Sequence, residues 1–194
     1  YSVVLMIRGN SRAVGLLNWV EAALVLGAGL ALLTYGVVGL AWGRSVAAAA
    51  ANSERLGAKV VLTDINRDLG EAAAAAARSK AGNAGGDAHF VFCDITDKAH
   101  VTAAVGETVK RFGALHILHN NAGGSTPADG PVTDAPEEEF WRVIKLDLFG
   151  TFLCAKVAIP EIIKAGGGSV INMTSSLALM GVAGRDCYTA AKGG

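Results

Sequence analysis

Short apolar runs alternate with amphipathic or alanine-rich segments along most of the chain. The runs are rich in β-branched residues and bounded by Gly, Asp or Asn, which predicts strands with helices between them. The predicted strands cover residues 23–28, 58–64, 88–93, 115–120 and 169–174. The predicted helices cover residues 45–55, 68–81, 98–112 and 137–164, followed by the segment with Tyr188 and Lys192. This alternation predicts an α/β fold with a doubly wound parallel sheet and helices on both faces.

The long helix over residues 137–164 has its own boundary signals. Asp134, with Glu137 three positions later, predicts a capping box at its start, and the glycines at 166–168 predict its end. The helix carries an apolar stripe at helical spacing, which we interpret mainly as core. Contact with a second subunit is the lesser alternative for this stripe.

Residues 22–43 admit two interpretations, because the run contains no charged residue. In the first, a parallel strand enters a glycine turn at Gly27 and Gly29, where a pyrophosphate would meet a helix N-terminus. In the second, the run crosses a bilayer as a helix. We favour the first, because a spanning helix would remove the first strand of the sheet. The sequence then predicts one dinucleotide-binding domain over residues 22–194, preceded by an extension of unknown role over residues 1–21.

Composition narrows the function classes. The chain has 194 residues, which is enough for one domain with a substantial core. Its net charge is zero and its pI is near 7.1, and it has no basic block that would indicate nucleic-acid binding. Its three cysteines, Cys93, Cys154 and Cys187, are widely spaced. They form neither a disulfide framework nor a metal-ligand pattern, so we expect no metal and a reducing, cytoplasmic location.

Polar residues follow the predicted strands, at the edge where open α/β sheets bind ligands. Asp64 ends the strand over residues 58–64, where an acid accepts hydrogen bonds from the adenosine ribose and repels a 2′-phosphate. This position predicts NAD as the cofactor, and Arg67, three residues later, leaves NADP as an alternative.

Tyr188 and Lys192 are four residues apart, so on a helix they share one face. The pKa of a phenol, about 10, is lowered by a nearby ammonium group. Such a tyrosine can donate a proton to a carbonyl or take one from an alcohol near neutral pH. Ser175 or Ser176, where the last strand ends, can hydrogen-bond the same oxygen. The alternative is an ordinary helix tyrosine beside a solvated lysine.

Ser175, Tyr188 and Lys192 resemble the catalytic residues of the short-chain dehydrogenase/reductase family, whose spacing of thirteen residues selects Ser175 over Ser176. The resemblance extends over residues 57–194. It implies that Tyr188 is the general acid/base, that Lys192 tunes it and reaches the nicotinamide ribose, and that Ser175 orients the substrate oxygen.

Two further segments are similar to the family. Asp94-Ile95 resembles its Asp-Val pair, in which the acid meets the adenine amino group. Asn120-Asn121-Ala122-Gly123 resembles a family hallmark. There, asparagines tie neighbouring strands together and Gly123 lets the cofactor lie close, so we expect Asn121 and Gly123 to bind the cofactor.

The chain departs from the family in three respects. Gly27 and Gly29 are separated from the next glycines by an apolar run, whereas the family places its glycines in one short loop. Asp147 stands where the family usually has an asparagine that holds a water in the proton relay. An aspartate adds charge and loses two donors, and if ionised it would hold Lys192 and slow turnover. The chain also starts at Tyr1 and stops at Gly194, which predicts a fragment.

The resemblance implies an NAD(P)-dependent oxidoreductase that interconverts an alcohol and a carbonyl on a small-molecule alcohol or ketone. We expect a homo-oligomer at full length. Two alternatives remain open: a non-catalytic nucleotide-binding or scaffold protein of the same fold, and a membrane-anchored reductase.

Overall fold

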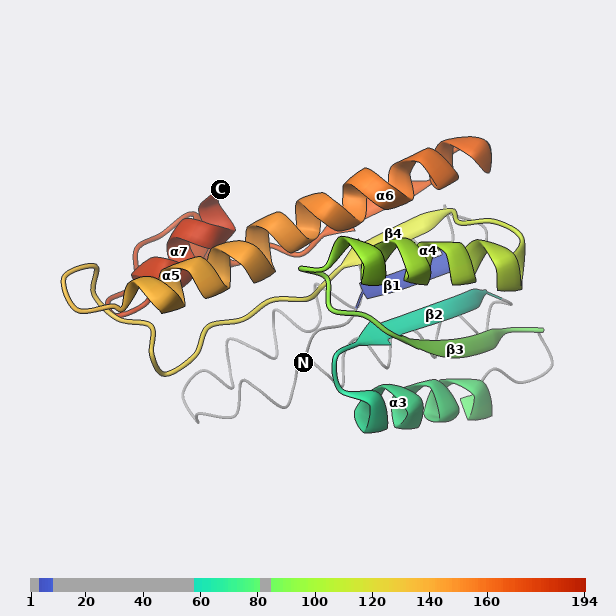
Figure 1. Ribbon diagram of the computed structural model, residues 1–194, viewed down its shortest axis with the longest axis horizontal. Coiled ribbons are helices and arrows are strands. Elements are labelled where there is room, and N and C mark those ends of the chain that lie inside the picture. The colour runs from blue at the N-terminus through green and yellow to red at the C-terminus, as the bar shows by residue number, and fades with distance from the viewer. Residues whose placement is uncertain (1–3, 9–57, 81–84) are drawn as a thin grey trace.

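The computed structural model describes residues 4–8, 58–80 and 85–194. Within these ranges five strands form one sheet in the order β3-β2-β1-β4-β5 (Figure 1). Their bounds are β1 Val4–Arg8, β2 Lys59–Asp64, β3 Asp87–Phe92, β4 Ile117–Asn120 and β5 Ser169–Asn172. The last four agree with the predicted strands to within two residues at each end.

The central strand β1 differs from the prediction. β2 is parallel to β3 and β4 is parallel to β5, but β1 lies between β2 and β4 and is antiparallel to both. The α/β class is confirmed, whereas the sheet is mixed in its middle. β1 falls within the extension over residues 1–21, for which no element was predicted. The strand predicted over residues 23–28, with Gly27 and Gly29, and the helix over residues 45–55 lie outside the described residues.

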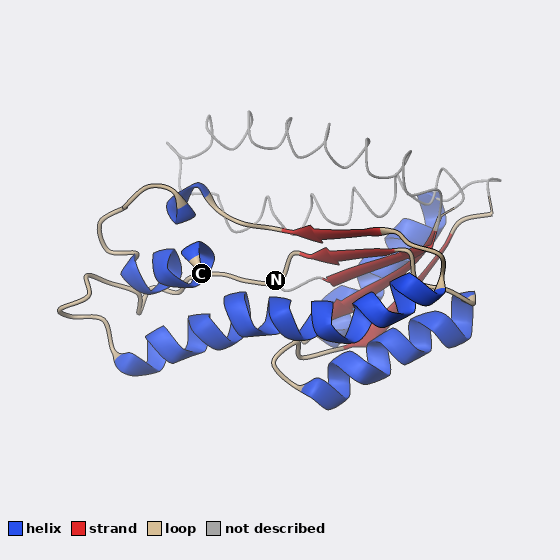
Figure 2. Cartoon of the chain, turned by 90° about the horizontal axis from the view of Figure 1, so that it is seen from above, coloured by secondary structure: helices blue, strands red, loops and turns tan. Residues whose placement is uncertain are grey.

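Helices cover both faces of the sheet. Helix α4 (Lys98–Phe112) and helix α6 (Gly150–Lys164) pack on one face, and α3 (Arg67–Lys80) packs on the other (Figures 1 and 2). Successive residues of β2 point to opposite faces, so Val61 joins the core beneath α4 while Val60 joins the core beneath α3. A strand buried on both faces reads as a continuous apolar run, as β2 does.

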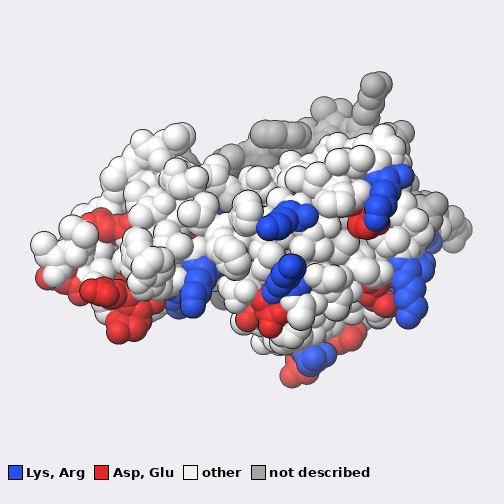
Figure 3. Space-filling model, turned by 45° about the horizontal axis from the view of Figure 1, so that its top comes forward, with Lys and Arg blue, Asp and Glu red and all other residues white. Residues whose placement is uncertain are grey.

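The helix predicted over residues 137–164 is interrupted. It consists of α5 (Glu137–Val143), a π-helical segment η2 (Ile144–Phe149) and α6. The predicted cap at Asp134 is wrong, because the N-cap position is Pro136 and the Asp134 N–H closes a turn onto the Pro131 carbonyl at 2.9 Å. Instead, three glutamates in the first turn of α5 stabilise the N-terminus of the helix by interacting with the helix dipole. Acidic side chains gather at this end of the molecule in Figure 3.

Beyond β5 the chain forms a short 3-10 turn, η3 (Ser176–Ala178), and then helix α7 (Asp186–Gly193), which carries Tyr188 and Lys192. α7 packs against α5 and η2, so residues far apart in sequence meet beyond the carboxyl ends of the strands. Of the described helices, none has both the length and the apolar character to cross a bilayer. The alternative span over residues 22–43 lies outside the described ranges.

Candidate active site

The ends of β2 and β3 each carry an aspartate. Asp64 is the last residue of β2 and is buried, and its Oδ1 accepts the Asn66 N–H at 2.8 Å. Asp94 follows β3, and its Oδ1 accepts from the Thr96 N–H at 2.9 Å and the Thr96 hydroxyl at 2.8 Å. Ile95 is buried in the core beneath α4 and α6. Both carboxylates therefore lie at the predicted edge, while the Ile95 side chain serves packing.

The segment after β4 joins the sheet to the site. Asn120 Nδ2 donates to Asn172 Oδ1 at 2.8 Å, which ties β4 to β5 as the resemblance implied. The half-buried Asn121 follows. At Gly123 a Cβ atom would lie 2.3 Å from Asp147 Oδ1 and 2.9 Å from Lys192 Nζ. The missing side chain of Gly123 thus lets the buried carboxylate and ammonium come close to the backbone.

The structure brings Ser175, Tyr188 and Lys192 together. Ser175 lies just beyond β5, and its hydroxyl is close enough to Tyr188 on α7 to lower the pKa of that phenol by hydrogen bonding. Lys192 Nζ lies 5.8 Å from the centre of the Tyr188 ring. The same Nζ donates to the Met173 carbonyl at 3.1 Å. These contacts hold the three side chains on one side of the molecule, at the carboxyl end of β5.

Asp147 forms the fourth part of this cluster. It lies in η2 and is buried, and its Oδ1 pairs with Lys192 Nζ at 3.0 Å. Both carboxylate oxygens also accept the Gly124 N–H, at 3.1 and 3.2 Å. π-helical turns are frequent at functional sites, and here the turn carries the carboxylate that contacts Lys192. The predicted contact between Asp147 and Lys192 is present.

The electrostatics differ from the expectation for Tyr188. Burial raises the pKa of Tyr188, the Asp147 charge raises it further, and the hydrogen bond with Ser175 opposes both effects. We expected Lys192 to lower this pKa, but in this structure the pKa of Tyr188 is raised, first by burial of the phenol and then by the charge of Asp147, which pairs with Lys192. Burial also raises the pKa of Asp147, against the attraction of Lys192.

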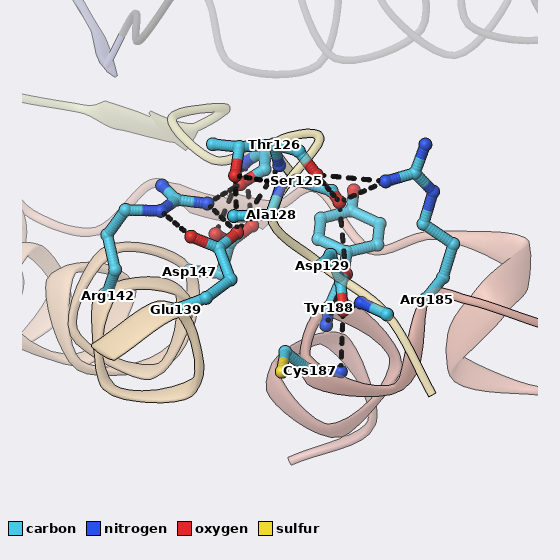
Figure 4. A network of polar contacts seen from close by, with 12 residues as sticks. Ser125, Thr126, Ala128, Asp129, Glu139, Arg142, Asp147, Arg185, Cys187 and Tyr188 are labelled. Carbon is cyan, nitrogen blue, oxygen red and sulfur yellow. Dashed lines mark hydrogen bonds and ion pairs between the residues drawn. The ribbon is translucent and has the colours of Figure 1, made fainter. Parts of the chain in front are cut away.

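A second polar network was missed by the sequence interpretation (Figure 4). Arg142 donates to both Glu139 carboxylate oxygens, at 2.7 and 2.8 Å, and to the Gly124 carbonyl at 2.9 Å. Glu139 also accepts from the Thr126 hydroxyl at 2.9 Å. The hydrogen bonds from Arg142 lower the pKa of Glu139 to about 2. The spacing of Glu139 and Arg142 along a helix signalled this pair, but their contacts with the loop carried no local signal.

A dinucleotide fits the residues at this edge. Asp64 and Asp94 present carboxylates at the ends of neighbouring parallel strands, where the adenosine half of NAD(P) binds in such sheets. Lys192 uses two of its three ammonium hydrogens on Met173 and Asp147, and the third has no partner among the described residues. That hydrogen is available to a ribose hydroxyl. Gly27 and Gly29, the predicted pyrophosphate contacts, lie outside the described residues.

Fold and site together define a Rossmann-type α/β domain with a cluster of Ser175, Tyr188 and Lys192. A family model described as enoyl-(acyl carrier protein) reductase matches residues 39–194, well over half of the chain. The chain belongs to the short-chain dehydrogenase/reductase family. One of the similar solved structures is described as NAD⁺-bound.

Three relatives illustrate the match. Trans-4-hydroxycyclohexanecarboxylate dehydrogenase of Sinomonas cyclohexanicum is 45% identical over 71% of this chain and 53% of its own length. Cyclopentanol dehydrogenase of Comamonas sp. is 37% identical over 72% of this chain and 53% of its length. The crystal structure of NAD⁺-bound xylitol dehydrogenase superposes with a TM-score of 0.68 at 31% identity, covering 76% of this chain and 56% of that one. The chain thus spans about half the length of the curated relatives it matches.

Proposed function

We propose that the protein interconverts a secondary alcohol and a ketone with NAD(P) as hydride carrier, and that Tyr188 is the general acid/base. The contact between the Tyr188 and Ser175 side chains, next to the Lys192–Asp147 pair, carries this proposal. A bound NAD(P) would supply the hydride chemistry at the substrate carbon. The residues of this chain position the substrate oxygen and handle its proton.

Each side chain has a defined task in this proposal. The Ser175 hydroxyl hydrogen-bonds the substrate oxygen and stabilises the charge that develops on it. In oxidation Tyr188, as the phenolate, takes the hydroxyl proton from the alcohol, and in reduction it returns a proton to the carbonyl oxygen. Lys192 would hold a ribose hydroxyl of the cofactor with its third N–H. Asp147 balances the lysine charge, which raises the Tyr188 pKa and slows oxidation near neutral pH.

The relatives support a substrate class. Trans-4-hydroxycyclohexanecarboxylate dehydrogenase and cyclopentanol dehydrogenase are both named for a hydroxyl group on a small carbon ring. We therefore assign a secondary hydroxyl on a small carbocycle as the substrate, and NAD as the preferred cofactor because Asp64 ends β2. Since these relatives are named as dehydrogenases, they do not favour the non-catalytic alternative. A homo-oligomer in the cytoplasm stays a prediction.

The test is turnover of cyclopentanol and cyclohexanol by the purified full-length protein, followed as NADH absorbance. We expect Tyr188→Phe to lose about 10²- to 10⁴-fold in kcat, the range for a lost general acid/base. NADH binding, measured by fluorescence, should persist in this variant. Full activity of Tyr188→Phe would refute the assignment.

The two adjacent serines provide a matched control. Ser175 is half-buried against Tyr188, whereas Ser176 is exposed. Ser175→Ala should lower kcat by about 10²-fold, as loss of one oxyanion donor does elsewhere, and Ser176→Ala should leave it unchanged. Equal effects of the two substitutions would exclude Ser175 as the group that orients the substrate oxygen.

A further inference from the structure

The helix that carries Tyr188 has its first amides satisfied from a distant part of the chain. α7 begins at Asp186, and its N-cap residue, Arg185, makes no side-chain capping bond among the described residues. The N–H groups of Cys187 and Tyr188 instead donate to Asp129, at 3.1 Å to Oδ1 and 3.1 Å to Oδ2 respectively. The amides of a first helical turn require such acceptors, and a carboxylate also complements the helix dipole.

Asp129 is built into the loop that supplies it. Asp129 is 8% exposed, and its carboxylate oxygens also accept hydrogen bonds from the Gly130 N–H at 2.9 Å and from the Ser125 hydroxyl at 3.0 Å. Arg185 donates from Nη1 to the Ser125 hydroxyl oxygen at 3.0 Å (Figure 4). The carboxylate is therefore held from the loop and from the start of α7 at the same time.

The same loop is held at its other end by residues of the site. The Gly124 N–H donates to Asp147, and the Gly124 carbonyl accepts from Arg142 Nη2 at 2.9 Å. One segment thus connects the carboxylate paired with Lys192 to the backbone of Tyr188. A shift of this loop would move two of the cluster's side chains relative to each other.

We propose that Asp129 is a positioning residue, which caps α7 from the loop and fixes the Tyr188 hydroxyl against Ser175. The proposal rests on the function proposed above, since it explains how the general acid/base is held in place. Asp129 itself touches neither the Tyr188 hydroxyl nor a reacting atom. Its effect passes through the backbone of Tyr188, the third residue of α7.

Removing this carboxylate should act mainly on the chemical step. Asp129→Ala leaves two amides at the start of α7 without their acceptor, so the first turn can move. A displacement of about 1 Å at a reacting group can cost about 100-fold in rate, and we expect kcat to fall by about 10- to 100-fold. Asp129→Asn keeps one carbonyl acceptor and should fall by less. The KM for NAD should stay within about threefold, because Asp64 and Asp94 are untouched.

The experiment compares Asp129→Ala and Asp129→Asn with Asp134→Asn in the full-length protein. Asp134 is an exposed aspartate in the same segment, so its variant controls for the loss of charge. The readouts are kcat and KM for alcohol and for NAD, the pH profile of kcat, and hydrogen exchange of the peptide containing Cys187 and Tyr188. We expect faster exchange, a lower kcat and a shifted pH profile in the Asp129 variants, partial rescue by Asn, and wild-type behaviour of Asp134→Asn.

Several results would overturn the proposal. A folded Asp129→Asn protein with wild-type kcat, pH profile and exchange is one. An Asp129→Ala protein that melts earlier but keeps its kcat per folded molecule is another, since that pattern indicates a purely structural role. If Asp129→Ala does not fold, Asp129→Asn and Ser125→Ala decide by the same criteria. Absence of turnover in the wild type would refute the proposed function instead, and unchanged exchange would then still refute the cap.

Discussion

In both α4 and α7 an aspartate carboxylate accepts the first backbone N–H groups of the helix, but the two aspartates come from different places in the sequence. Asp97 stands directly before α4 and accepts the Ala99 N–H at 2.6 Å and the His100 N–H at 3.3 Å. Asp129 lies 58 positions before Cys187, whose N–H it accepts. The cap of α4 is local, whereas the cap of α7 exists only after the chain has folded.

The two caps show that α4 is part of the framework of the fold, whereas α7 is part of the candidate site. α4 also ends on a local signal, Gly113 in the left-handed region at φ 82°, whose N–H bonds the Val109 carbonyl. Its core-facing residues are fully enclosed beneath the sheet. α7 depends on a loop, on η2 and on the end of β5 for its position. The position of α4 is specified by its own residues, and that of α7, which carries Tyr188, by its neighbours.

The largest expected effect on kcat comes from a glycine beside the Tyr188 cluster, Gly123, and a glycine in α4, Gly106, provides the comparison. Gly123→Ala would place a Cβ 2.3 Å from Asp147 Oδ1, so the buried pair with Lys192 must move. We expect kcat to fall by about 100-fold or more, as for other displacements of about 1 Å. Gly106, an exposed position in α4, has nothing within 4 Å of its Cβ position. Gly106→Ala should leave kcat unchanged and raise stability by ~0.5–1 kcal/mol, through helix propensity.

Steady-state kinetics and urea unfolding measure the two effects of these glycine substitutions. If Gly123→Ala retained wild-type kcat, the close packing of Gly123 against Asp147 would have no part in the activity. If Gly106→Ala lowered kcat, α4 would not be the independent framework element described above.

The next effect concerns charge in the site. Asp147 raises the pKa of Tyr188, so Asp147→Asn should lower that pKa and increase the phenolate fraction at neutral pH. For a shift of one pKa unit, the oxidation rate below the pKa should rise by about tenfold, and the acid limb of the pH profile should move to lower pH. The exposed Asp68 of α3 provides the control, since Asp68→Asn removes the same charge far from Tyr188.

The pH profile of kcat between about pH 6 and 10 tests this prediction. An unchanged rate and profile in Asp147→Asn would mean that the carboxylate does not restrain Tyr188. A slower variant with a profile shifted to higher pH would mean that the charge of Asp147 assists the relay, opposite to our interpretation.

What could be predicted from the sequence follows the same division. The bounds of α4 were predicted to the residue, and the residues that cap it, Asp97 and Gly113, lie directly beside the helix in the sequence. The meeting of Ser175, Tyr188 and Lys192 followed from spacing and family resemblance. Asp129 could not be predicted, because its partners are far away in the chain and a loop aspartate usually bonds its own turn.

Further features were not predicted from the sequence, each for a physical reason of its own. β1 contributes a short apolar run whose antiparallel pairing with β2 and β4 is decided by its place in the sheet, not by its residues. The π-helical turn η2 lies inside an uninterrupted helical pattern, so periodicity predicted one continuous helix. The raised pKa of Tyr188 required knowledge of burial and of the distance between Asp147 and Lys192.

The smallest expected effect is the loss of the local cap. Asp97→Ala removes the acceptor for two amides of α4 and should lower the free energy of unfolding by about 1 kcal/mol, the usual cost of an N-cap. Because α4 takes no part in the cluster around Tyr188, kcat and its pH profile should stay at the wild-type values. Urea unfolding and kinetics on the same preparation measure both quantities. A loss of kcat in Asp97→Ala as large as in Asp129→Ala would mean that any weakened helix start impairs the enzyme, and the distinction between the two caps would collapse.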